Sequence, residues 1–281
     1  MVMTDKPVSI DPMARVAPAA KIGTGVTIGP FCVVGPEAEL GDGVTLHSHV
    51  TVSGATHVGA RTEILPFTAI GGPPQDLSYK GEPTRLEIGE DCLIRENVTV
   101  NRGSARTGLT AIGNNCFLMS FSHVAHDCRV GNNVIMANVA TLAGHVHVGD
   151  FVFFAGLCTV HQFTRIGEYA MVGGMTGVKD DVVPFGMAFA PNGVVGELVS
   201  INAVGMKRRG FSRADMHAVR ACYKALFDGE GTYAERRQKA AETYRDHPAA
   251  GRVIRFVEAG GKRPLMRPPT RGVSSDIADD A

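Results

Sequence analysis

Residues 112–148 read IGNNCF LMSFSH VAHDCR VGNNVI MANVAT LAGHVH V when the sequence is divided into groups of six. Each group begins with a large apolar residue, and its fifth residue is small. The large residues are Ile112, Leu118, Val124, Val130, Met136, Leu142 and Val148, and the small ones are Cys116, Ser122, Cys128, Val134, Ala140 and Val146. A fixed short period of this kind is typical of a solenoid, in which each repeat buries its apolar face against the next repeat.

The period of six extends in both directions and predicts one β-solenoid over residues 10–183, after a lead-in of residues 1–9. Six residues accommodate a short strand and a bend. Three such strands form a triangular coil of eighteen residues, and successive coils stack about 4.8 Å apart. The period pauses at residues 71–87 and 103–110 and resumes in register at Ile88 and Ile112. These two segments are rich in Gly, Pro and charge, so we expect loops that leave the coil and carry function.

The composition excludes several classes of protein. The 281-residue chain has no Trp, 34 Gly and a formal net charge of zero. Met1–Ser9 lacks the apolar core of a secretory signal, and no stretch is long and apolar enough for a membrane span, so we expect a cytoplasmic protein. The small inward position holds five of the six cysteines, namely Cys32, Cys92, Cys116, Cys128 and Cys158. We therefore expect buried thiols rather than a disulfide framework or a thiolate metal site.

Positive charge is concentrated in the C-terminal part of the chain. Residues 207–271 hold 16 Lys and Arg against 7 Asp and Glu, a net charge of +9. Ser212 with Asp215, and Thr232 with Glu235, are capping boxes, which predicts a linker and a small α-helical domain over residues 184–260. Residues 261–281 are expected to be a disordered tail. The basic helices are either ordinary solvated faces or a docking surface for an acidic partner. Nucleic acid is not favoured, because no groove-reading motif accompanies the charge.

Several polar residues of the repeat region point outward and stack, because residues eighteen apart lie one coil apart on the same face. The stacked residues are His126, Gly144 and Gln162 in one column and Asp127 and His145 in the next, with His161 and His123 beside them. An aspartate can orient an imidazole and stabilise its cation, and a glycine N–H can stabilise an oxyanion. This face therefore predicts a catalytic site.

Gly156 and Gly174 also stack on each other, but on a different face of the prism. Two faces of one convex prism cannot share a pocket, so a site that uses both needs several prisms side by side. A cyclic homotrimer with its sites between subunits is the simplest arrangement.

Ten segments give the chain a specific resemblance to a known family. They are 28–32 (IGPFC), 75–77 (QDL), 81–85 (GEPTR), 94–96 (IRE), 101–103 (NRG), 123–128 (HVAHDC), 141–146 (TLAGHV), 160–163 (VHQF), 171–174 (MVGG) and 205–213 (GMKRRGFSR). Over roughly residues 10–260 the chain resembles the UDP-N-acetylglucosamine O-acyltransferases of lipid A biosynthesis, a branch of the hexapeptide-repeat acyltransferases. The resemblance implies a left-handed parallel β-helix followed by a small α-helical domain, a homotrimer, and neither metal nor cofactor.

The resemblance also implies a reaction and its residues. Enzymes of this family transfer an (R)-3-hydroxyacyl chain from acyl carrier protein to the sugar 3-hydroxyl of UDP-N-acetylglucosamine. His126 would be the general base, Asp127 would orient it, and the Gly144 N–H would stabilise the oxyanion. The implied binding residues are Asp76, His123, His145 and His161 at the sugar and acyl sites, Gln162 at the acyl hydroxyl, Gly174 stacked on Gly156 along the acyl groove, and Asn202, Arg208 and Arg209 at the nucleotide or its phosphates. The basic helices would receive the acidic carrier protein.

Four alternatives stay open. One variant of the family uses a 3-amino sugar nucleotide, and Ser78 and Val204 stand where many members have Lys and Glu. The sister N-acyltransferase of the pathway shares the coil but carries an extra N-terminal domain, whereas only nine residues precede the first repeat here. A γ-class carbonic anhydrase binds zinc through three histidines, for which His123, His126 and His145 would serve. A purely structural or binding solenoid is the fourth.

Overall fold

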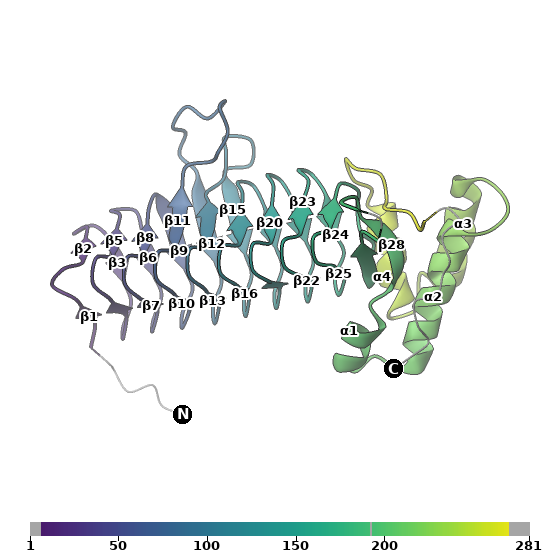
Figure 1. The fold of residues 1–281 in the computed structure, drawn as a ribbon, viewed down its shortest axis with the longest axis horizontal. Coiled ribbons are helices and arrows are strands. Elements are labelled where there is room, and N and C mark those ends of the chain that lie inside the picture. Colours follow the sequence, from purple (N-terminus) through teal and green to yellow (C-terminus); the bar gives the residue numbers. More distant parts are fainter. Residues whose placement is uncertain (1–6, 192, 270–281) are drawn as a thin grey trace.

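A computed structural model describes residues 7–191 and 193–269, which form a triangular prism of short strands with helices packed at one end (Figure 1). The first sheet contains β1 (Ser9–Ile10), β4 (Thr27–Ile28), β7 (Thr45–Leu46), β10 (Glu63–Ile64), β13 (Leu93–Ile94), β16 (Phe117–Leu118), β19 (Ile135–Met136), β22 (Phe153–Phe154), β25 (Met171–Val172), β27 (Gly186–Phe189) and β28 (Glu197–Ile201). The second sheet contains β2 (Arg15–Val16), β5 (Val33–Val34), β8 (Thr51–Val52), β11 (Ala69–Gly72), β14 (Thr99–Asn101), β17 (His123–Val124), β20 (Thr141–Leu142), β23 (Thr159–Val160) and β26 (Gly177–Val178). The third contains β3 (Lys21–Ile22), β6 (Glu39–Leu40), β9 (Ala55–Val58), β12 (Arg85–Ile88), β15 (Leu109–Ile112), β18 (Arg129–Val130), β21 (His147–Val148) and β24 (Arg165–Ile166).

The strands of the coil pair in parallel and in the register that the sequence predicts. Within a regular stretch, partners lie eighteen residues apart, as Phe117 pairs with Ile135 and Ile135 with Phe153. The register also holds across both interruptions, because Glu87 pairs with His57 below it and with Ala111 above it. The two intervening loops leave the prism at neighbouring coils and stand together above it (Figure 1). The predicted fold class is therefore confirmed as a parallel β-helix followed by helices.

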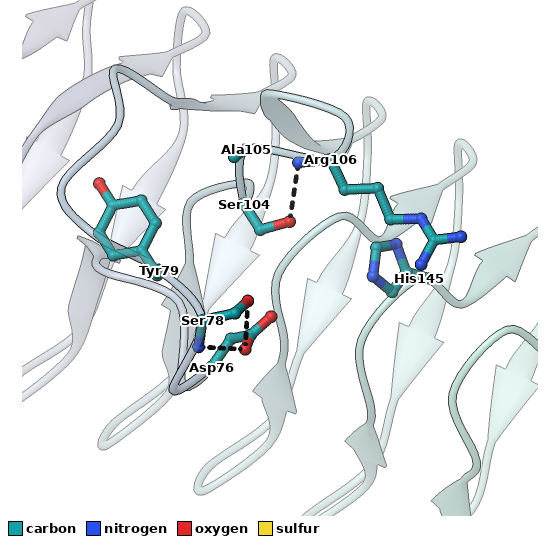
Figure 2. A pocket seen from close by; sticks show the side chains of 7 residues that line it. All are labelled: Asp76, Ser78, Tyr79, Ser104, Ala105, Arg106 and His145. Carbon is teal, nitrogen blue, oxygen red and sulfur yellow. Dashed lines mark hydrogen bonds between the residues drawn. The ribbon is translucent and has the colours of Figure 1, made fainter.

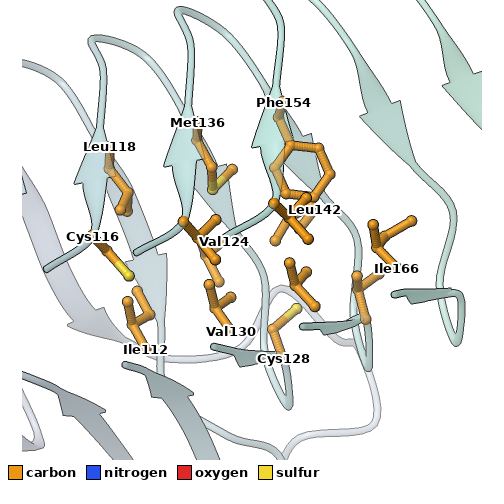
Figure 3. Packing of buried hydrophobic residues seen from close by; sticks show 14 of the residues in the cluster. Ile112, Cys116, Leu118, Val124, Cys128, Val130, Met136, Leu142, Phe154 and Ile166 are labelled. Carbon is orange, nitrogen blue, oxygen red and sulfur yellow. The ribbon is translucent and has the colours of Figure 1, made fainter. Parts of the chain in front are cut away.

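The interior of the prism is filled by the two columns of the repeat (Figure 3). Leu118, Met136 and Phe154 are fully buried, as the large position requires. Cys116 and Cys128 occupy the small position beside them and are buried and free. The same holds for the other cysteines that the structure describes, which confirms the expectation of buried thiols.

Most turns at the corners of the prism contain a residue in the left-handed region, directly before the small inward residue. Asp127, His145 and Phe163 have φ angles of 61°, 62° and 65° and stack at one corner on successive coils. An L residue in this conformation costs about 1–2 kcal/mol, which the stacked coils and their hydrogen bonds offset. The turn directs these side chains away from the interior of the prism. The geometry of the corner itself therefore positions Asp127 and His145.

The prism ends in a hairpin and four helices. Residues 186–201, expected as part of a linker, instead hold β27 and β28; β27 is parallel to β25, and β28 is antiparallel to β27. The helices are α1 (Ala203–Arg208), α2 (Arg213–Phe227), α3 (Tyr233–Tyr244) and α4 (Ala250–Glu258). Both predicted capping boxes form, Ser212 with Asp215 and Thr232 with Glu235. Within the described ranges, none of the helices has the length and apolar character needed to cross a bilayer.

The expectation of a disordered tail from residue 261 is wrong for residues 261–269. The Met266 side chain is buried, and its N–H donates to the Asp181 carbonyl over 2.8 Å. Asp181 is also buried and accepts from the Arg165 Nε over 2.7 Å, so the segment is fastened to the last coil. Residues 270–281 lie outside the described residues.

Candidate active site

His126 and Asp127 form a hydrogen-bonded pair at the corner after β17. The His126 Nδ1 lies 2.7 Å from the Asp127 Oδ2, and the Asp127 side chain is fully buried. An ionised carboxylate can only accept, so Nδ1 carries the proton of a neutral ring and Nε2 keeps its lone pair. The pair therefore presents a base at Nε2, with a buried anion behind it to stabilise the imidazolium.

Burial works against the charge on Asp127, but hydrogen bonds outweigh it. Desolvation raises the pKa of this carboxyl, while bonds from Ser104, Thr107 and His126 lower it, and the net pKa lies below its ordinary value. Ser104 and Thr107 belong to the second loop and do not figure in the sequence analysis. In the sequence, the one sign of their role is that residues 103–110 contain hydroxyl side chains and lie one coil below Asp127.

Gly144 lies directly beside the His126 ring. A Cβ at this position would lie 2.7 Å from the ring Cε1 and 2.8 Å from Nε2, closer than side chains approach one another. Among the described residues the Gly144 N–H donates to no backbone carbonyl, whereas the N–H groups of Ala143 and His145 donate to Val160 and His126. A free N–H beside the base is where an oxyanion would be stabilised.

His145 lies on the coil above Asp127. Its Nε2 is 3.6 Å from the Asp127 Oδ2, and its ring stacks on Phe163 with centroids 4.5 Å apart. Burial lowers its pKa, the Asp127 carboxylate opposes this shift, and the charges of His126, Arg106 and Lys262 add to it, so the net pKa lies below its ordinary value. Lys262 lies 4.3 Å from the centre of the Phe163 ring. The net effect favours the neutral form of His145 beside the base.

The two loops enclose a hollow of about 270 Å³ next to this pair (Figure 2). Its lining residues are Asp76, Ser78, Tyr79, Ser104, Ala105, Arg106 and His145. Bonds from the Ser78 N–H and hydroxyl lower the pKa of Asp76, with smaller contributions from His126 and His145. Asp76 is thus an ionised acceptor in the wall of the hollow, which suits a hydroxyl-rich ligand.

The other predicted histidines, His123 in β17 and His161 directly after β23, come from the same sheet and its edge. The Nδ1 of His123 lies 2.7 Å from the Thr99 hydroxyl, and burial lowers the pKa of the ring. The Nδ1 of His161 lies 2.6 Å from Nη2 of Arg263, whose Nε donates to the Gln162 carbonyl. Arg263 comes from the segment expected to be disordered, so the sequence analysis missed it.

Five predicted residues lie away from the dyad within one chain. Gly156 and Gly174 stack at the corner between the first and second sheets. Asn202 caps α1 by accepting the Gly205 N–H, and its Nδ2 donates to the Tyr169 carbonyl, so both ends of the amide are engaged. Arg208 and Arg209 are exposed at the end of α1, and Arg209 covers the Phe151 ring at 4.5 Å.

A metal ion would find one group of candidate ligands among the described residues: His126, Asp127 and His145, whose ligand atoms lie within 4.8 Å of one another. The zinc alternative needs His123 instead of Asp127, and His123 does not belong to that group. Both carboxylate oxygens of Asp127 already accept hydrogen bonds. The described residues therefore do not gather His123, His126 and His145 around one point, as that zinc site requires.

Comparisons with known proteins find relatives over nearly the whole chain. Residues 181–266 match the profile described as UDP N-acetylglucosamine O-acyltransferase, domain 2, and residues 19–54 and 110–144 match the bacterial transferase hexapeptide profile. An acyl-[acyl-carrier-protein]–UDP-N-acetylglucosamine O-acyltransferase of Azorhizobium caulinodans is 56% identical over 94% of this chain and 96% of that protein. The relative from Brucella ovis is 42% identical over 98% of this chain and 99% of its own.

Solved structures extend the likeness to three dimensions. LpxA from Acinetobacter baumannii is 38% identical, with a TM-score of 0.87 over 92% of this chain and 99% of that chain. The UDP-N-acetylglucosamine acyltransferase of Francisella novicida is 33% identical, with a TM-score of 0.89 over 92% and 94%. Fold and sequence agree, and the chain belongs to the acyl-[acyl-carrier-protein]–UDP-N-acetylglucosamine O-acyltransferase family, the hexapeptide-repeat acyltransferases of lipid A biosynthesis.

Proposed function

We propose that the chain transfers an (R)-3-hydroxyacyl group from acyl carrier protein to the 3-hydroxyl of UDP-N-acetylglucosamine, with His126 as general base. The observation that carries this proposal is the bond of 2.7 Å between the His126 Nδ1 and the buried Asp127, which leaves Nε2 free beside Gly144. The two substrates are those for which the relatives are named, acyl-[acyl-carrier-protein] and UDP-N-acetylglucosamine.

The proton and the electron pairs balance in two steps. In the first, Nε2 of His126 takes the hydroxyl proton while the sugar oxygen attacks the thioester carbonyl carbon, and the Gly144 N–H stabilises the resulting oxyanion. In the second, the oxyanion collapses, the carbon–sulfur bond breaks, and the thiolate takes the proton back from the imidazolium. The products are an ester and free carrier thiol. Asp127 stays ionised throughout and stabilises the transient cation.

We place the remaining predicted residues in a site shared between subunits of a homotrimer. Along the corner that bears Gly156 and Gly174, four apolar side chains are 39–69% exposed: Phe121, Val139, Leu157 and Met175. Leu77, at the tip of the first loop, is 99% exposed. A contiguous exposed apolar edge of this kind is typical of a surface that binds another protein. In a trimer, a neighbouring copy would bring the corner with Gly156 and Gly174, and Arg208 and Arg209 of α1, to the His126–Asp127 dyad. Light scattering should give three times the mass of one chain.

In this arrangement Arg208 and Arg209 hold the nucleotide phosphates, with Asn202 fixing the helix that carries them. His123, His145, His161 and Asp76 line the sugar and acyl sites, and Gln162 faces the acyl hydroxyl. The carrier protein docks on the helices, where Arg213, Arg220 and Lys224 of α2 are exposed. Their charge complements an acidic partner.

The test is product identification with purified chain, 3-hydroxyacyl carrier protein and UDP-N-acetylglucosamine. We expect a sugar nucleotide that is heavier by one hydroxyacyl group and whose ester lies on the 3-hydroxyl. Parallel reactions offer the 3-amino analogue as acceptor. Transfer to the amine alone would replace the proposed acceptor, and no transfer to either would overturn the proposal.

A further inference from the structure

The second loop, residues 103–110, is built around Asp127. The Oδ1 of this carboxylate accepts from the Ser104 N–H over 3.1 Å and from the Thr107 hydroxyl. The Asp127 N–H donates to the Thr110 hydroxyl oxygen over 2.8 Å. Two residues of this loop, Ser104 and Thr107, and Thr110 of β15 thus hold the side chain and backbone of the residue that bonds His126.

The loop is itself fixed to the coil. The Arg85 N–H donates to the Gly108 carbonyl over 2.9 Å, and the Gly103 N–H donates back to the Arg85 carbonyl over 3.1 Å. A further bond of 2.8 Å from the Gly108 N–H to the Ser104 carbonyl closes the loop on itself. The hydrogen-bond donors for Asp127 therefore sit on a rigid support, as a positioning role requires.

The Thr107 hydroxyl has one proton and two acceptors within reach. The Leu109 carbonyl lies 3.2 Å away, while the Asp127 Oδ1 is closer and charged. A charge-assisted bond is the stronger of the two, so the proton goes to Asp127. The residue as a whole is exposed, so its hydroxyl can be removed without disturbing the interior of the prism.

We propose that Thr107 is a positioning residue for the general base: its hydroxyl, together with the Ser104 N–H, holds Oδ1 of Asp127 so that Oδ2 faces the His126 Nδ1. A carboxylate fixed through one oxygen cannot rotate about its terminal bond, so the other oxygen keeps its direction. The imidazole then keeps Nε2 aimed at the acceptor hydroxyl. The catalytic consequence rests on the proposed function, because it requires His126 to be the base.

The test compares Thr107→Val, which keeps the shape of the side chain but loses the hydroxyl, with Thr107→Ser, which keeps the hydroxyl. We expect kcat of Thr107→Val to fall about tenfold, less than the roughly 10²–10⁴-fold of losing a general base. The KM values for both substrates should stay within about twofold, because no substrate contact changes. Thr107→Ser should restore kcat to near the wild-type value. Circular dichroism and thermal melting establish that each variant is folded.

A second readout does not depend on turnover. The His126 Nδ1 proton, bonded to a buried carboxylate, should give a downfield proton resonance that is absent from His126→Ala. We expect this resonance in wild type and Thr107→Ser, and its broadening or upfield shift in Thr107→Val. Wild-type kcat and an unchanged resonance in Thr107→Val would overturn the inference. An inactive wild type with the expected resonance pattern would instead contradict the proposed function and leave the positioning of the ring established.

Discussion

Replacing Gly144 by alanine should disable the base without unfolding the protein. The new Cβ would lie 2.7 Å from Cε1 and 2.8 Å from Nε2 of His126, whereas ordinary contacts begin at 3.4 Å. The ring must therefore retreat by about 0.6–0.7 Å, and its bond of 2.7 Å to Asp127 cannot survive that movement unchanged. A misplacement of about 1 Å can cost roughly 10²-fold in rate. We expect kcat of Gly144→Ala to fall about 10- to 100-fold, with KM little changed.

The assay is steady-state acyl transfer, and Gly35→Ala is the matched control. Gly35 follows β5 and Gly144 follows β20, at the same corner of the prism. β8, β11, β14 and β17 lie between these two strands, so the two glycines are five coils apart. The nearest atom to its added Cβ is the Val52 carbonyl oxygen at 3.4 Å, an ordinary contact. Gly35→Ala should keep wild-type kcat, and both variants should melt within a few degrees of the wild type. Wild-type kcat in Gly144→Ala would refute the placement of the ring.

Three further predictions follow from the same structure. Phe154→Ala should lower the free energy of unfolding by about 3–5 kcal/mol in chemical denaturation, because the ring is fully buried in the prism; a loss below about 1 kcal/mol would contradict the packing. Burial lowers the pKa of His123 below its ordinary 6.5 in the folded protein. As the pH drops through 6.5, the His123 imidazole therefore takes up a proton in the unfolded chain before it does so in the folded one, and the free energy of unfolding should fall. His123→Gln should make that slope shallower, and an unchanged slope in denaturation series would contradict the burial. Arg220→Glu with Lys224→Glu should raise KM for acyl carrier protein while leaving KM for the sugar nucleotide unchanged; equal effects on both would contradict docking on α2.

The fold could be predicted because a strict period determines which side chains point inward. The large and small columns assign the strands and the coil length, and they carry the register across both loops. The period also places His126, Gly144 and Asp127 at one corner before any coordinates are known. Where the period ends, at Val183, the prediction weakens, since the pairing of β27 with β25 and β28 depends on contacts between distant residues.

The supporting residues could not be predicted in the same way. Thr107 reaches Asp127 only because the second loop folds back on β12, and no repeat encodes that conformation. Residues 261–269 lack apolar periodicity, and one buried residue, Met266, with backbone bonds to Asp181 fixes them. Asn202 had a readable local signal, because asparagine directly before a short helix is a typical N-cap. Its amide is engaged in that cap and in a bond to Tyr169.

If the Nε2 of His126 removes the acceptor proton, loss of this imidazole must slow acyl transfer sharply. Acyl transfer to UDP-N-acetylglucosamine would be measured for wild type, His126→Ala and His57→Ala. His57 is an exposed histidine whose Nδ1 lies 3.8 Å from Glu39, away from the site. We predict that kcat falls roughly 10²–10⁴-fold in His126→Ala and is unchanged in His57→Ala. Transfer in His126→Ala at the wild-type rate would contradict the account.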